Sequence, residues 1–159
     1  MRILVAIGVV TAALLATSTA AAADQSLVNA YVCYLQGGHV YRPADTTIVA
    51  RFGWAAKNNG LVQDFVESQT TTVVANGGTA VDVSNLFSRP ADYPPGGFVS
   101  WMNYDTGILL APGESTTFRL VSTVAHPILD GAVFENGESG KPLFGEGTIL
   151  DVTCTVTGV

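Results

Sequence analysis

Few side chains in this sequence could carry out acid–base or nucleophilic chemistry. The two histidines are His39, in QGGHVYRP, and His126, in STVAHPILDG. Ser122 and Asp130 flank His126 along the chain, but a catalytic triad is defined by its geometry and not by closeness in sequence. A histidine beside a proline is typical of a turn, and no G-x-S-x-G, P-loop or dinucleotide motif is present. We therefore expect no enzyme activity, and a secreted hydrolase that depends on His126 is only our third hypothesis.

Acidic residues gather between positions 130 and 146, in DGAVFENGESGKPLFGE. They are Asp130, Glu135, Glu138 and Glu146. Calcium takes six to eight oxygen ligands, often from a loop of this kind. The spacing matches no EF-hand, so we interpret the segment as a solvated hairpin and leave calcium binding open. Two histidines and two paired cysteines are too few for a structural zinc site, and we expect no cofactor.

Aromatic residues are concentrated in RPADYPPGGFVSWMNYDTG. Rings on a loop stiffened by proline offer a large contact area at a low entropic cost. The candidate ligand contacts are Tyr93, Trp101 and Tyr104, which could stack on sugar rings or fill a pocket of a partner. The alternative is that these rings belong to the core, since a central strand buried on both faces gives the same pattern.

The two cysteines are Cys33, in NAYVCYL, and Cys154, in the last predicted strand. An even number of cysteines in an exported chain predicts a disulfide, although two buried free thiols are the alternative. A bridge that closes so long a loop stabilises a fold by up to about 5 kcal/mol in the chain-entropy model. We expect the bridge to join the last strand to the first, which is a structural role.

The elements that must position these residues are mostly strands, because apolar and polar residues alternate along several segments. The clearest segments are TIVARFGWAAKN, ESTTFRLVSTVA and ILDVTCTVTGV. The predicted inward residues are Ile48, Ala50, Phe52, Trp54 and Ala56; Phe118, Leu120 and Val124; and Leu150, Val152, Cys154 and Val156. Turn signals such as NGG and LAPGES separate the strands at short intervals. One segment, NGLVQDFVESQ, has helical spacing instead, with Asn58 or Asn59 as its cap.

The fold class that follows is all-β, as an antiparallel sandwich with one short helix around residues 60–69. The sequence resembles immunoglobulin-like sandwich domains in three features: an export signal within the first 23 residues, the LAPGES turn and the bridged terminal strands. That resemblance concerns the fold class alone and implies no function.

The first 23 residues have the form of a secretory signal peptide, with Arg2, an apolar run and Ala21-Ala22-Ala23 before Asp24. The apolar run is too short to span a bilayer comfortably. We therefore expect a signal peptide at 1–23 and a single domain at 24–159 in the extracellular space or periplasm. Without Arg2, six basic residues face thirteen acidic ones, which gives a net charge of −7. This charge argues against binding to nucleic acid or to anionic membranes.

These observations favour a small secreted module without catalytic activity, either binding or structural, that acts on a protein or glycan at a cell surface. A carbohydrate-binding module that uses the aromatic loop is the second hypothesis. Neither the ligand nor the oligomeric state follows from the sequence.

Overall fold

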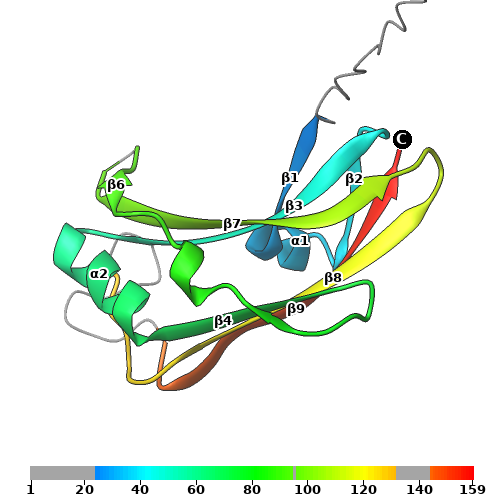
Figure 1. Ribbon diagram of the computed structural model, residues 1–159. Helices are drawn as coiled ribbons and strands as arrows, with labels where there is room; N and C mark the ends of the chain where they lie inside the picture. Colours follow the sequence, from blue (N-terminus) through cyan, green and yellow to red (C-terminus); the bar gives the residue numbers. More distant parts are fainter. Residues whose placement is uncertain (1–23, 95, 132–143) are drawn as a thin grey trace, which may run out of the picture.

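Two β-sheets form the two layers of the protein in the computed structural model, which describes residues 24–94, 96–131 and 144–159 (Figure 1). The first sheet has the order β1 (Gln25–Asn29), β3 (Thr46–Ala56), β7 (Phe98–Leu110), β6 (Ala91–Asp92). The second has the order β2 (His39–Arg42), β9 (Gly147–Gly158), β8 (Ser115–Val124), β4 (Gln69–Ala75), β5 (Val81–Asp82). The helices are α1 (Ala30–Leu35), α2 (Asn59–Ser68) and a short 3₁₀ turn at Ser84–Leu86. The described part of the chain contains no helix that is long and apolar enough to cross a membrane.

The inward faces predicted from the period-two pattern are confirmed. The alternate residues of β3, from Ile48 to Ala56, are buried, and so are those of β8 and β9. They form one core between the sheets, together with Phe65 of α2. Phe65 stacks on Trp54, with 5.2 Å between the ring centroids, and meets Phe52 edge-on at 6.2 Å.

Two strand pairs differ from the purely antiparallel sheets that the sequence suggested. β1 lies parallel to β3, from Gln25 opposite Thr47 to Asn29 opposite Arg51, and β2 lies parallel to β9. Parallel neighbours need a crossover connection and cannot be joined by a tight hairpin. The chain provides the crossover because α1 and β2 lie between β1 and β3, and β2 belongs to the other sheet. The LAPGES turn likewise joins strands of different sheets, β7 and β8.

The predicted helix is confirmed as α2, which spans Asn59–Ser68. The side chain of Asn58 accepts a hydrogen bond from the backbone N–H of Leu61 at 3.0 Å, so Asn58 is the N-cap. Val62 and Phe65 are the buried residues of the helix, as the spacing of apolar residues requires.

The predicted disulfide is confirmed between Cys33 and Cys154. The expectation that it joins the last strand to the first is wrong, because Cys33 lies in helix α1 and not in β1. Asn29 ends β1 and caps α1, since its side chain accepts hydrogen bonds from the N–H groups of Tyr31 and Val32. The bridge therefore fixes α1 to β9.

Candidate binding cleft between strands β3 and β9

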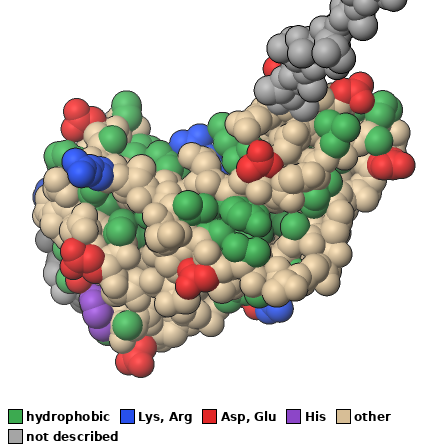
Figure 2. Space-filling view, in the orientation of Figure 1, with side chains coloured by type: hydrophobic (Ala, Val, Ile, Leu, Met, Phe, Trp, Pro, Cys, Tyr) green, Lys and Arg blue, Asp and Glu red, His purple; other side chains and the backbone are tan. Residues whose placement is uncertain are grey.

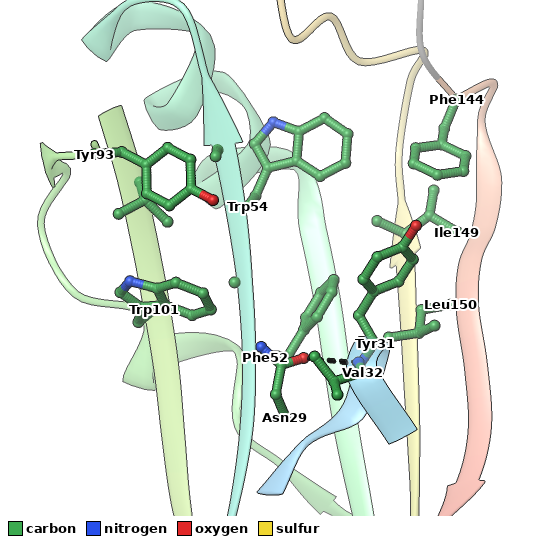
Figure 3. Close-up of a pocket in the computed structure, with 13 residues that line it drawn as sticks. Asn29, Tyr31, Val32, Phe52, Trp54, Tyr93, Trp101, Phe144, Ile149 and Leu150 are labelled. Carbon is green, nitrogen blue, oxygen red and sulfur yellow. Dashed lines mark hydrogen bonds between the residues drawn. The ribbon is translucent and has the colours of Figure 1, made fainter. Parts of the chain in front are cut away.

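A cleft of about 710 Å³ opens along one side of the sandwich, between the edges of β3 and β9 (Figure 3). It exists because the flanking strands are short. β1 covers β3 only as far as Arg51, and β2 covers β9 only from Thr155 onward. Beyond those points neither strand has a neighbour on this side within the described residues. Helix α1 lies at one end of the gap, where the disulfide fixes it.

The wall formed by β3 is aromatic. Phe52 and Trp54 both point from β3 toward the interior and line the cleft, and each is only 5% exposed. The Trp54 ring also meets Phe144, with 5.7 Å between the centroids. Figure 3 shows Phe144 across the opening from Trp54, near the start of β9.

The opposite wall and the lower end are apolar as well. Ile149 and Leu150 project from β9, and Tyr31 and Val32 project from α1 toward the same space (Figure 3). No charged side chain is among the described residues that line the cleft. The site can thus bury apolar groups without leaving a charge unpaired.

The structure brings two of the three predicted contact residues to this cleft. Tyr93 and Trp101 are both half-buried and both line it. Tyr104 is half-buried too, but it lies opposite Ala50 and packs against the core, on the other face of the sheet from Trp101. The three rings therefore do not form one patch.

The position of Trp101 depends on its neighbours in β3. The guanidinium carbon of Arg51 lies 4.0 Å from the centroid of the Trp101 ring, a cation–π distance. Gly53 is opposite Trp101 in the β3–β7 register, and a Cβ atom at Gly53 would overlap the six-membered part of the indole. Glycine is needed here because the ring lies directly against the backbone.

Other lining residues were not predicted as contacts. The sequence pattern places Trp54 in the core alone and does not distinguish Tyr31, Val32 or Phe144 as contacts. In the structure, the six-residue helix α1 buries Ala30 and Cys33 and leaves its other apolar residues toward the surface. Tyr31, Val32, Tyr34 and Leu35 are 39–64% exposed.

Two residues of the hydrolase hypothesis, Ser122 and His126, have other partners in the described part of the chain. The hydroxyl of Ser122 is buried and hydrogen-bonds to Thr71 at 2.9 Å. His126 is exposed, and its Nε2 lies 3.4 Å from Asp64.

Only part of the acidic segment at 130–146 can be assessed. Asp130 is buried and Glu146 is exposed, while Glu135 and Glu138 lie outside the described residues. Within those residues, no group of three or more His, Cys, Asp and Glu side chains is placed to hold a metal ion.

Comparison of the chain with models of known families, with curated proteins and with solved structures gives no match.

Proposed function

We propose that the protein is a small secreted binding module without catalytic activity, built on an immunoglobulin-like sandwich, and that the cleft between β3 and β9 is its ligand site. The observation that supports this most is the uncharged, largely apolar lining of an open cleft. Ligand sites of proteins are typically concave, mostly apolar and a few hundred Å³ in volume. The cleft has each of these properties.

Secretion is supported by the disulfide, because such bonds persist in oxidising compartments and are rare in the cytosol.

The surface favours a neutral ligand over nucleic acid. Figure 2 shows acidic side chains spread over one face of the molecule, and the basic side chains on that face do not form a cluster. Phosphate backbones require such clusters.

The proposal is tested with an apolar probe, an anilinonaphthalene sulfonate dye, and a matched pair of variants. Val32→Glu places a charge in the lining of the cleft, whereas Leu35→Glu places the same charge on the same helix but outside the lining. We expect the dye to bind the wild type and Leu35→Glu alike and to bind Val32→Glu much more weakly. Equal binding to all three proteins would show that the dye does not use the cleft.

A carbohydrate ligand is the second candidate, because Tyr93 and Trp101 lie together at this cleft. Arg51 and the backbone of Gly53 already contact the Trp101 ring, which limits the ring surface on which a sugar could stack. A glycan screen with the wild type and Trp101→Ala separates the two ideas. Glycan binding that is lost in Trp101→Ala would favour this candidate over an apolar ligand.

A further inference from the structure

Among the described residues, nothing pairs with the backbone of β3 along the part of its edge that faces the cleft. Near one end, the N–H of Thr47 donates to the carbonyl of Asp24 at 2.8 Å. At the other end, the N–H of Lys57 donates to the carbonyl of Asp130 at 2.7 Å. Alternate residues of a strand direct their N–H and C=O groups to the same edge. The N–H and C=O groups of the odd-numbered residues of β3 therefore all point to the edge that faces the cleft.

Gly53 and Ala55 belong to this odd-numbered set and lie between the two paired ends. The ladder with β1 stops at Arg51, so no described strand pairs with them on this side. Within the described part of the chain, their N–H and C=O groups therefore form a short open stretch between two paired ends of this edge. Unpaired backbone groups at a sheet edge are a template for another strand.

The opposite side of the cleft also has an open strand edge. The N–H of Thr155 donates to the carbonyl of Gly38 at 2.8 Å, which marks the point where β9 begins to be covered. Before that point β9 has no partner on this side in the described chain. The cleft is therefore a gap between two open edges, with apolar side chains on both walls.

We propose that the cleft binds an extended segment of a partner polypeptide, which adds to β3 as a strand at Gly53 and Ala55. This rests on the proposed function and specifies the ligand. A polypeptide backbone supplies donors and acceptors at the spacing of a strand edge, which a sugar or a small apolar molecule does not.

The lining also defines the side chains of the partner segment. A strand on this edge turns alternate side chains into the space between Trp54 and Leu150, where no charge lines the walls. Those inward positions of the segment are apolar. Beyond the cleft, Tyr34 of α1 is 57% exposed, so a longer segment finds further apolar surface there.

The test uses the oxidised exported protein and the peptide acetyl-Lys-Thr-Val-Thr-Val-Thr-Val-Lys-amide. The chain has two tryptophans, Trp54 and Trp101, and both line the cleft, so intrinsic fluorescence reports occupancy directly. Two further peptides carry backbone N-methyl groups, one on the valines and one on the threonines. N-methylation removes N–H donors and leaves the side chains unchanged.

We expect the unmodified peptide to bind, and one N-methylated peptide to bind at least about tenfold more weakly than the other, because only one set of N–H groups faces β3. If the peptide with methylated threonines binds more weakly, the added strand is antiparallel to β3. If the peptide with methylated valines binds more weakly, the added strand is parallel to β3. Binding to Leu35→Glu should equal that to the wild type, and binding to Val32→Glu should be weaker.

Four results would overturn this inference. If both methylated peptides bind as well as the parent peptide, the cleft takes apolar groups without strand pairing, and the proposed function stands alone. If the dye binds and no peptide binds, the cleft likewise takes apolar groups without strand pairing. If the wild type sediments as a dimer and Val32→Glu as a monomer, a second copy of the chain occupies the cleft and not a partner. If neither dye nor peptide binds, the proposed function fails as well.

Discussion

Trp101 of β7 lies against Gly53 of β3, where even a methyl group would overlap the indole. This contact holds a large aromatic ring against the outer surface of the sheet, beside the open edge of β3. It connects the packing of the sheet to the shape of the cleft.

Replacing Gly53 with alanine should destabilise the fold and displace Trp101. Forcing an extra carbon into a well-packed contact typically costs about 1–3 kcal/mol. Denaturant unfolding followed by tryptophan fluorescence measures both effects. Gly145→Ala is the control, because a Cβ atom at Gly145 meets nothing within 4 Å. Equal losses in the two variants would contradict the importance of the contact.

Removing the disulfide should lower the free energy of unfolding by about 2–5 kcal/mol, because the bond closes a loop of 121 positions. The variant is Cys33→Ser with Cys154→Ser, compared with the wild type under oxidising and reducing conditions. Since the bond fixes α1 beside the cleft, the variant should also bind the dye less well. An unchanged midpoint of unfolding would show that α1 is held by its packing alone.

The Arg119–Asp151 pair on the exposed face of the second sheet should make stability depend on acidity. Asp151 accepts two hydrogen bonds from Arg119, at 2.8 and 2.7 Å, and these bonds lower the pKa of Asp151 below its ordinary value. A lowered pKa in the folded state stabilises the fold above the unfolded pKa, and the stabilisation is lost as the pH falls through the folded pKa. Both side chains are largely exposed, so the effect is small.

The measurement is the melting temperature of the wild type and of Asp151→Asn across the acidic range. We expect the two curves to differ at neutral pH and to converge as the pH falls. Added salt should reduce the difference, because exposed ion pairs are screened. Curves that stay parallel down to strong acid would show that the pair contributes nothing.

A buried polar contact between β4 and β8 should be sensitive to the loss of one partner. Thr71 and Ser122 are fully buried and share a hydrogen bond of 2.9 Å, and Thr71 also donates to Gln69. Ser122→Ala should cost about 1–3 kcal/mol, the usual penalty when a buried polar group loses a partner. A double-mutant cycle with Thr71→Val measures the coupling, and a coupling near zero would contradict this account.

Much of the fold could be predicted from local patterns. Alternation identified the buried faces of β3, β8 and β9, because side chains in a strand alternate with period two. The cap at Asn58 and the spacing of Val62 and Phe65 likewise predicted α2. The same period places Trp101 and Tyr104 on opposite faces of β7, because residues three apart in a strand lie on opposite faces.

The cleft could not be predicted because it depends on which strands are neighbours and where each one ends. Alternation shows the face of a strand but not its partner, so the parallel pairing of β1 with β3 was missed. The open edge at Gly53 and Ala55 follows from that pairing, since β1 ends at Asn29 where α1 begins. The sequence predicts a strand at Cys33 because the six residues of AYVCYL are too few for helical spacing to be distinguished.

The most direct test of the account is amide hydrogen exchange at Gly53 and Ala55, measured by NMR with and without the peptide. We expect both amides to exchange freely in the unbound protein and at least about tenfold more slowly in the complex, because a new strand then accepts their hydrogen bonds. Unchanged exchange at both amides, while tryptophan fluorescence shows the peptide bound, would contradict strand addition at β3.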